Sequence, residues 1–225
     1  MMTGILPVDK PKGVTSFSMV AKLRKISGIK KIGHSGTLDP FASGVLILLL
    51  GREYTRLADQ FLLQDKEYLA TIRLGCTSDT YDPEGVITKV SDRTPSMDEL
   101  DLALESFQGE ISQVPPMFSA KKVQGKKLYE LARKGITIDR KPSKVRVKTE
   151  LLAYEYPYVT LKVSCSKGTY IRSIAHDLGE RLKTGAYLQE LVRTRSGKVS
   201  LDKCVKLENL KPDNLSSYFI QHESI

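Results

Sequence analysis

Asp39 lies at a corner of the chain where reactive and flexible residues gather. Residues 31–50 read KIGHSGTLDPFASGVLILLL, so glycines, a histidine and hydroxyl side chains precede Asp39-Pro40, and an aliphatic run soon follows. Glycine lets the backbone approach a ligand closely, and Pro40 fixes the main chain after the carboxylate. A carboxylate held in this way can act as a nucleophile or a base if a nearby cation keeps it ionised. The plainer alternative is a turn or helix-cap residue, a common role of Asp before Pro.

Arg172 is the candidate for that cation. It falls in the first turn of a helix expected after the segment SKGTY, where the helix dipole disfavours a positive charge. A residue placed against its local preference often serves tertiary electrostatics, although a solvent-facing arginine would give the same pattern. Tyr68 and Tyr170 accompany these elements, and their rings could carry an unstacked base or be ordinary core aromatics.

The sequence offers no metal or cofactor motif. Its three histidines are His34, His176 and His222, and their spacing matches no set of metal ligands. It contains no Walker A loop, no G-x-G-x-x-G after a strand and no G-x-S-x-G elbow. We therefore expect no metal and no cofactor, and a reaction in which nothing is added or oxidised.

The elements expected around these residues alternate between strands and helices, which indicates an α+β or mixed α/β domain organised around one sheet. Hydrophobic residues at helical spacing predict a helix from Ser16 that stops at Gly28 and a second helix over residues 54–62. Ser96 and Glu99 form a capping box for a further helix. Strands are expected over residues 44–50, 66–75, 145–152, 159–166 and 187–197.

Charge is segregated along the chain, whose net charge is +9. Lys10–Lys31 holds seven basic residues and no acidic one, and Lys121–Lys148 holds eleven basic and two acidic residues. This favours a polyanionic partner, because each cation placed on a phosphate releases counterions; a solvated basic surface is the alternative. The longest apolar run, Val45–Leu50, is too short to span a bilayer, and no signal-peptide pattern is present. With three widely spaced cysteines, we expect a cytoplasmic protein that binds nucleic acid and no membrane.

The segment GHSGTLDPFASGVL closely resembles the signature of the TruB family of tRNA pseudouridine synthases, written around G-H-x-G-T-L-D-P. DKPKGVTS at Asp9–Ser16 resembles the family's N-terminal motif. Four further blocks follow in the family's order: KEYLATIRLG, QVPPMFSAKKVQGKKLYELARKG, GTYIRSIAHDLG and LQELVRTRSG. The resemblance covers residues from about 5 to about 210. Phe41 and Ser43 differ from the residues that usually follow the aspartate in the family.

The resemblance implies a pseudouridine synthase-like catalytic domain of mixed α/β (α+β) class, with a long, mostly antiparallel sheet flanked by helices and loops. The implied partner is tRNA, bound at its T-stem and loop, and the implied target is the uridine at conventional position 55. Uridine becomes pseudouridine when the bond from N1 to C1′ breaks and C5 joins C1′, so no cofactor or energy source is needed. A monomer is expected.

The resemblance also assigns catalytic roles. Asp39 matches the catalytic aspartate, Arg172 its partner, and Tyr68 the ring that stacks on the flipped base and helps to remove the C5 proton. Asp39 would either attack the sugar or base covalently or take the C2′ proton to give a glycal-like intermediate, and the sequence leaves both open. Flipping a base costs a few kcal/mol, which stacking would partly offset.

Further positions match the family's substrate-binding residues: His34, Lys10, Tyr170, Leu191, Arg193 and Arg195. His34 would enter the space left by flipped nucleotides, and Tyr170 would belong to the same pocket. Lys10 and Leu191 would support the pocket, and the two arginines would face the RNA backbone.

We expect a catalytic domain over residues 1–210, with a basic insert around 115–148, and a short tail over 211–225. Bacterial members of the family commonly carry a C-terminal RNA-binding domain of the PUA type. Only about 30 residues follow Arg195 here, too few for a complete PUA domain. We expect the basic insert to contribute more of the affinity for tRNA in compensation.

Two other functions compete with the isomerase. One is a non-catalytic protein that binds or folds tRNA on the same scaffold, against which the presence of Asp39, Tyr68 and Arg172 argues. The other is a hydrolase with paired carboxylates, which needs Asp79 or Asp82 close to Asp39.

Overall fold

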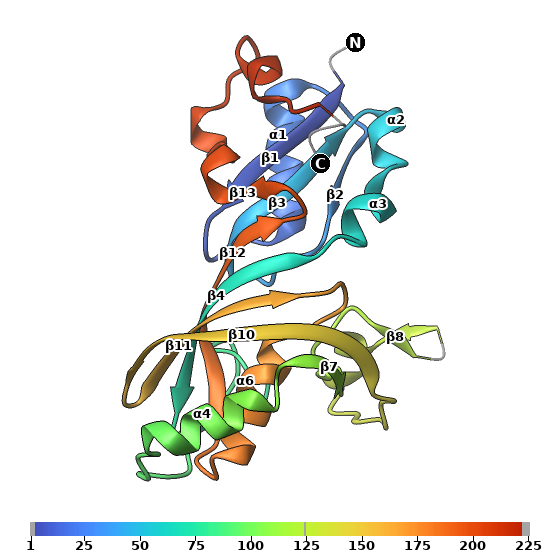
Figure 1. The fold of residues 1–225 in the computed structure, drawn as a ribbon. Coiled ribbons are helices and arrows are strands. Elements are labelled where there is room, and N and C mark those ends of the chain that lie inside the picture. Colours follow the sequence, from blue (N-terminus) through green and yellow to red (C-terminus); the bar gives the residue numbers. More distant parts are fainter. Residues whose placement is uncertain (1–2, 124, 222–225) are drawn as a thin grey trace. The chain divides into compact units, whose positions relative to one another are not determined.

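Helices and strands alternate along the chain in the computed structural model, which describes residues 3–123 and 125–221 (Figure 1). The chain packs into two units, Met1–Leu69 with Leu191–Ile225, and Ala70–Glu190. Two long strands, β4 (Lys66–Leu74) and β12 (Ala186–Ser196), contribute residues to both units.

The first unit is built mainly from the two ends of the chain. In order it holds β1 (Gly4–Lys10), α1 (Ser16–Ser27), β2 (Ile32–Ser35), β3 (Ser43–Leu50), α2 (Arg52–Thr55), α3 (Ala58–Leu62), β13 (Val199–Ser200) and the 3₁₀ turns η1 (Leu201–Lys203), η2 (Leu207–Asn209) and η3 (Leu215–Tyr218).

The second unit is built from the middle of the chain. In order it holds β5 (Cys76–Ser78), β6 (Ile87–Lys89), α4 (Met97–Glu105), β7 (Gly109–Gln113), β8 (Lys122–Val123), β9 (Lys126–Lys127), α5 (Leu128–Ala132), β10 (Ser143–Glu155), β11 (Tyr158–Cys165) and α6 (Ile171–Arg181).

The pairing of the strands confirms the expected fold class. Within the described residues, the main sheet has nine strands in the order β1-β3-β12-β4-β11-β10-β7, with β13 on β12 and β2 on β3. Antiparallel pairs predominate, and β12 runs parallel to β3. The protein is therefore a mixed α+β protein with a long, mostly antiparallel sheet.

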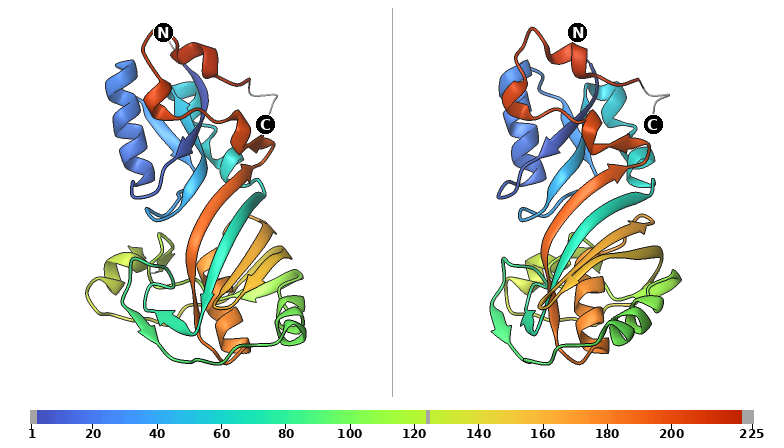
Figure 2. Two further views of the ribbon diagram at one scale, coloured as in Figure 1. Left: turned by 90° about the vertical axis from the view of Figure 1, so that its left-hand side faces the viewer. Right: turned by 60° about the vertical axis from the view of Figure 1, so that its left-hand side comes forward.

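β3 forms the centre of the first unit, and its residues from 45 to 50 are all at most 1% exposed. Its even-numbered leucines pack in one cluster with Met19 and Leu23 of α1. Its odd-numbered residues pack in another cluster with Phe61 of α3. Figure 2 shows the helices α1, in blue, and α3, in cyan, on opposite sides of the strands of this unit. Because both faces are covered, this strand is apolar at every position and does not alternate.

The helix α1 begins and ends where the sequence predicts. The Thr15 side chain accepts a hydrogen bond from the N–H of Ser18 at 3.0 Å, which caps the first turn. Gly28 ends the helix with φ +71, and its N–H donates to the Arg24 carbonyl at 2.9 Å. The predicted stop at Gly28 is confirmed.

The single helix predicted over residues 54–62 is wrong, because the chain breaks it into α2 and α3. Leu57 lies outside helical geometry, with φ −87 and ψ 2, and its N–H donates to the Tyr54 carbonyl at 2.9 Å. After this break Phe61 is buried, whereas Leu62 is 46% exposed. The amphipathic pattern therefore identified helical residues but not the turn that divides them.

The second unit follows its local patterns closely. Ser96 and Glu99 cap α4 reciprocally, as the capping box predicts. In β10, Val145 and Val147 are buried and alternate with exposed basic residues, as in a strand with one face covered. The predicted strands over residues 145–152 and 159–166 are confirmed as β10 and β11.

Residues after 210 are part of the first unit's core. Leu215 is fully buried, and Ile220 forms a bridge to Ile5 of β1. Residues 222–225 of the expected tail, including His222, lie outside the described residues. Within the described part of the chain, no helix is long and apolar enough to cross a membrane.

Candidate active site

The loop that carries Asp39 is fixed on both sides of the aspartate. Before it, Ser16 Oγ accepts from the N–H of Leu38 at 2.9 Å and donates to the Leu38 carbonyl at 3.1 Å. After it, the Pro40 carbonyl accepts from the N–H of Gly13 at 2.8 Å. Asp39 itself is half-buried, and its carbonyl accepts from the N–H of Ala42 at 3.1 Å. The rigid mounting suggested by the glycines and the proline thus also depends on the start of α1.

Lys10 lies under this loop and is fully buried. Its ammonium donates to the carbonyls of Pro11 at 2.9 Å, Val14 at 2.7 Å and Pro40 at 3.4 Å. A buried ammonium needs such oxygen partners, because its desolvation is otherwise costly. Lys10 therefore links the residues before α1 to the Asp39 loop, and its support of a substrate pocket stays a prediction.

Arg193 is also buried, with 2% of its surface exposed. Its guanidinium donates to the Val45 carbonyl at 2.7 Å and to the Gly36 carbonyl at 2.8 Å. Nε and one terminal nitrogen of Arg193 are therefore bonded inside the protein, and its expected contact with the RNA backbone stays a prediction. Arg193 ties the glycine-rich loop to β3.

Arg195 is more open, with 37% of its side chain exposed. It donates to the Gly197 carbonyl at 2.8 Å and lies 3.7 Å from a carboxylate oxygen of Glu67. A contact of Arg195 with RNA stays a prediction.

His34 lies on β2 opposite Leu48. Its Nδ1 is buried and has no hydrogen-bond partner among the described residues. Burial, and then the positive charge of Arg193, lower the pKa of His34 below its ordinary 6.5. The imidazole is therefore neutral at neutral pH, and its entry into the RNA loop stays a prediction.

Tyr68 and Leu191 are buried in the first unit, 9% and 6% exposed respectively. Both lie on the long strands, Tyr68 on β4 and Leu191 on β12. Buried positions on strands fix a side chain well, which suits a support for a pocket. The stacking of Tyr68 on a base is untested by this placement.

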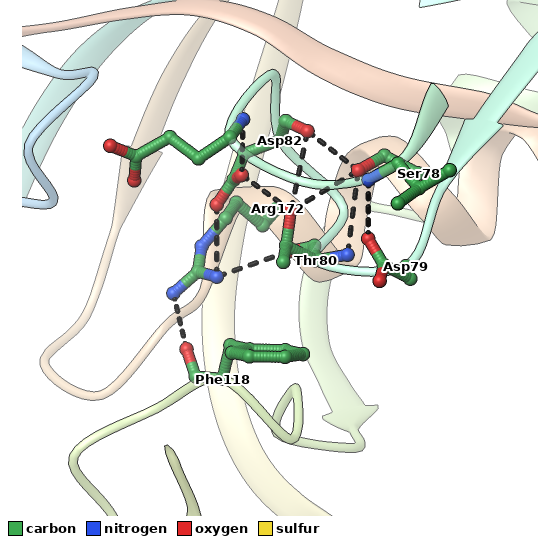
Figure 3. A network of polar contacts seen from close by, with 8 residues as sticks. Ser78, Asp79, Thr80, Asp82, Phe118 and Arg172 are labelled. Atoms are coloured by element: carbon green, nitrogen blue, oxygen red, sulfur yellow. Dashed lines mark hydrogen bonds and ion pairs between the residues drawn. The ribbon is translucent and has the colours of Figure 1, made fainter. Parts of the chain in front are cut away.

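Arg172 lies in the first turn of α6, and its side chain is 6% exposed. Figure 3 shows its guanidinium facing Asp82, Thr80 and Phe118. One terminal nitrogen donates to a carboxylate oxygen of Asp82 and to the Thr80 carbonyl, both at 3.1 Å. The other donates to the Phe118 carbonyl at 2.8 Å. The guanidinium is thus held in one plane by two separate segments.

Asp82 is as deeply buried as Arg172, with a side chain 4% exposed. Its Oδ1 accepts from Thr80 Oγ1 at 2.6 Å and from the N–H of Glu84 at 3.0 Å, while Oδ2 faces Arg172. A buried ion pair is tolerated when further hydrogen bonds satisfy both ions, as they do here. Because both oxygens are occupied, Asp82 is poorly suited to the hydrolase alternative, in which it would act as a general acid.

Tyr170 precedes α6, and the side chain of Gln113 holds its backbone. Gln113 accepts from the Tyr170 N–H at 2.8 Å and donates to the Tyr170 carbonyl at 3.0 Å. Ser173 Oγ also donates to the Val114 carbonyl at 3.0 Å. The start of α6 is therefore locked to the segment that follows β7.

Some residues of this network were not predicted from the sequence, namely Gln113, Thr80 and the Asp82–Arg172 pair. From the sequence, Asp82 is suggested only as a second catalytic acid for the hydrolase alternative. The dense Ser, Thr and Asp content of TSDTYDPEG was a signal for a hydrogen-bonded turn, but no local pattern names Arg172 as its partner.

Asp39 and Arg172 belong to different units, so their pairing stays a prediction. Within the described residues, no group of three or more His, Cys, Asp or Glu side chains could hold a metal ion.

Family models match most of the chain. The model described as TruB family pseudouridylate synthase (N terminal domain) matches residues 24–171. The model described as tRNA pseudouridylate synthase B C-terminal domain matches residues 172–218.

Curated relatives cover nearly the same length. The tRNA pseudouridine synthase B of Protochlamydia amoebophila is 59% identical over 204 residues, which is 91% of this chain and 78% of that protein. The protein of the same name from Chlamydia pneumoniae is 59% identical over 202 residues, 90% of this chain and 86% of that protein. The one from Clostridium novyi is 47% identical over 220 residues, 97% of this chain and 76% of that protein.

Solved structures with a similar fold are larger assemblies. A chain in the crystal structure of a Cbf5-Nop10-Gar1 complex has a TM-score of 0.74 and 32% identity, and the match covers 99% of this chain and 56% of that chain. A chain in an H/ACA RNP bound to a substrate RNA containing 2′-deoxyuridine has a TM-score of 0.68 and 31% identity. The match covers 92% of this chain and 52% of that chain. This chain spans about half the length of those two.

Proposed function

This chain belongs to the TruB family of pseudouridylate synthases, and we propose that it isomerises uridine to pseudouridine in tRNA. The finer proposal is that the target is the uridine at conventional position 55 of the T-loop. Relatives named tRNA pseudouridine synthase B, 57–59% identical over nine-tenths of the chain, support the substrate class.

The observation that carries the proposal at the level of chemistry is the fixed loop around Asp39. Its neighbours Leu38 and Pro40 are both tied to other segments, while the aspartate remains half-buried and thus partly open to solvent. A reacting carboxylate must be placed accurately, because an error of about 1 Å can cost roughly a hundredfold in rate.

In the proposed reaction the bond between N1 and C1′ breaks, the uracil turns over, and C5 forms a new bond to C1′. The proton on C5 leaves, and N1 ends protonated, so atoms and electrons balance without an oxidant or a reductant. Asp39 acts at the sugar or base, either by a covalent bond or by removal of the C2′ proton. Both routes need an ionised carboxylate at the start.

Other residues prepare this step. We assign to Arg172 the role of keeping Asp39 ionised, because a nearby guanidinium favours the ionised form of a carboxylate. Its fixed orientation against Asp82 and Phe118 suits a group that must be placed before the substrate arrives. Tyr68 is assigned two roles: its ring stacks on the flipped base, and it helps to remove the proton from C5.

The proposal is tested with unmodified tRNA labelled with tritium at C5 of uridine, incubated with the protein and no additive. Tritium release is expected, with pseudouridine mapped to position 55. The Asp39→Asn and Asp39→Ala variants are expected to release none, while binding tRNA within a few-fold of the unaltered protein. Appreciable turnover by either variant would remove Asp39 from the reaction.

The same assay separates the isomerase from the non-catalytic RNA-binding alternative. A protein that binds tRNA tightly but releases no tritium would support the alternative. Product at a uridine other than position 55 would keep the activity and reject the assigned target.

A further inference from the structure

Tyr81, in the second unit, has a left-handed backbone with φ +64, which a bulky residue seldom adopts. It stands between Thr80 and Asp82, whose carbonyl and carboxylate both accept from Arg172. Non-glycine residues in this region carry a cost in free energy and persist only where surrounding contacts impose them. Contacts around Tyr81 must therefore hold this conformation.

Two contacts do so. The Tyr81 ring stacks on the imidazole of His176, with ring centroids 4.0 Å apart and planes inclined by 7°. The Tyr81 carbonyl accepts from the N–H of Leu188 at 3.0 Å. Tyr81 is thus anchored to α6 through its side chain and to β12 through its backbone.

His176 and Arg172 are four residues apart on α6, so they lie on the same side of the helix, one turn apart. The segment 80–82 meets both: Thr80 and Asp82 contact Arg172, and Tyr81 between them contacts His176. The positive φ of Tyr81 lets consecutive residues reach two consecutive turns of one helix. A more extended backbone would alter at least one of these contacts.

The rest of this segment is tightly bonded, so an anchor at Tyr81 acts on all of it (Figure 3). Ser78 Oγ donates to the Asp82 carbonyl at 2.6 Å, and Asp79 accepts from the N–H of Val86 at 2.8 Å. A Cβ added to Gly85 would lie 2.1 Å from a carboxylate oxygen of Asp79, so a side chain at position 85 would collide with this network. Hydrogen bonds linked in this way polarise and strengthen one another.

We propose that the stack of Tyr81 on His176 is a positioning device for Arg172. By fixing the segment 80–82 on α6, the stack keeps the Thr80 carbonyl and the Asp82 carboxylate aligned on one nitrogen of the guanidinium. Tyr81 and His176 are positioning residues, since they act through Arg172 and need no contact with the RNA. This inference rests on the proposed function, in which Arg172 serves the catalytic aspartate.

The test compares side chains that keep a ring with side chains that do not. Tyr81→Phe and His176→Phe retain stacking, whereas Tyr81→Leu and His176→Leu remove it at comparable size. With enzyme saturating over tRNA, the leucine variants are expected to lower the single-turnover rate of tritium release about tenfold, and the phenylalanine variants to stay within about twofold. The Kd for tRNA is expected to stay unchanged in all four.

Two further variants separate positioning from general loss of structure. The double variant Tyr81→Leu/His176→Leu is expected to be no slower than either single variant, because all three lack the same contact. Tyr154→Leu removes a ring of the same unit whose hydroxyl donates to the Pro95 carbonyl, and it is expected to keep the normal rate. Melting temperatures of all variants are recorded beside the rates.

Several results would overturn the inference. Leucine variants with the normal rate, or phenylalanine variants as slow as the leucine ones, would do so. If Tyr81→Leu fails to fold, the comparison of His176→Leu with His176→Phe decides alone. No product from the unaltered enzyme would reject the proposed function and this inference with it, whereas normal product with unaffected variants rejects the inference only.

Discussion

Arg172 and Asp82 combine two opposite contributions to stability. Each loses its hydration on burial, and each is then compensated by the other and by the hydrogen bonds around the pair. The pair is therefore more important for orientation than for net stability. This distinction can be measured, because removal of one partner and removal of both have different effects.

Arg172→Met is expected to lower the free energy of unfolding by about 3–5 kcal/mol, since it leaves the Asp82 carboxylate buried without its cation. The double variant Arg172→Met/Asp82→Leu is expected to regain a large part of that loss, yet to remain inactive. Urea unfolding and tritium release measure the two effects. Lys144→Met is the control, because its partner Glu110 and Lys144 itself are 65% and 76% exposed, and a loss below about 1 kcal/mol is expected there. A double variant no more stable than Arg172→Met would contradict this account.

The lowered pKa of His34 predicts how the stability of the protein depends on pH. Its pKa in the folded protein lies below the unfolded value of 6.5, so the unfolded chain binds the proton more readily. The contribution of His34 to stability is therefore present above pH 6.5 and is lost as the pH falls through the folded pKa. His34→Phe is expected to flatten this part of the stability curve, measured by urea unfolding between about pH 5 and pH 8. An unchanged acid slope in His34→Phe would show that other groups cause it.

At the scale of elements, the close approach of β3 and β12 depends on Gly44. The two strands run parallel there, with Arg193 opposite Gly44. Gly44 has φ +103, and a Cβ at this position would lie 2.3 Å from the backbone oxygen of Arg193. The glycine thus lets the strand after the Asp39 loop meet its neighbour.

Gly44→Ala is expected to lower the free energy of unfolding by roughly 1–3 kcal/mol for the left-handed backbone, and further by the cost of the clash. Gly13→Ala is a matched control, because Gly13 has φ +81 but nothing within 4 Å of an added Cβ. The difference between the two variants in urea unfolding isolates the clash. Activity of Gly44→Ala should fall as well, since Arg193 and the Asp39 loop shift together. Equal losses in the two variants would mean that the strands separate at no cost.

The sequence predicts features that depend on neighbouring residues better than contacts that only the fold creates. The end of α1 and the cap of α4 depend only on neighbouring residues in the sequence, so Gly28 and the pair Ser96–Glu99 predict them. The break at Leu57 has no Gly or Pro to mark it and was missed. The partner of Arg172 was missed for a different reason: Asp82 is 90 residues away in the chain, and only the fold brings it there. The burial of Arg193 also depends on the fold, because a basic residue in a basic protein carries no local sign of being buried.

For the molecule as a whole, the excess of positive charge can be tested by salt. Not every lysine of the basic segments is free to meet RNA: Lys10 is buried under the Asp39 loop, and Lys121 donates to Ser143 at 2.7 Å. Lys126 and Lys134, by contrast, are exposed. The expected grip of the Lys121–Lys148 segment on tRNA therefore depends on such exposed residues.

The affinity for tRNA is expected to fall linearly with added salt on logarithmic axes. Lys126→Gln/Lys134→Gln should make this slope shallower by roughly 0.7–0.9 for each lysine that contacts a phosphate. Lys89→Gln is the control: Lys89 is exposed, pairs with Asp92, and lies outside both basic segments, so its slope should match that of the unaltered protein. If the double variant keeps the full slope, the segment is a solvated surface and the counterions are released elsewhere. If binding ignores salt altogether, the tRNA is held without phosphate contacts, and the charge of the chain serves another purpose.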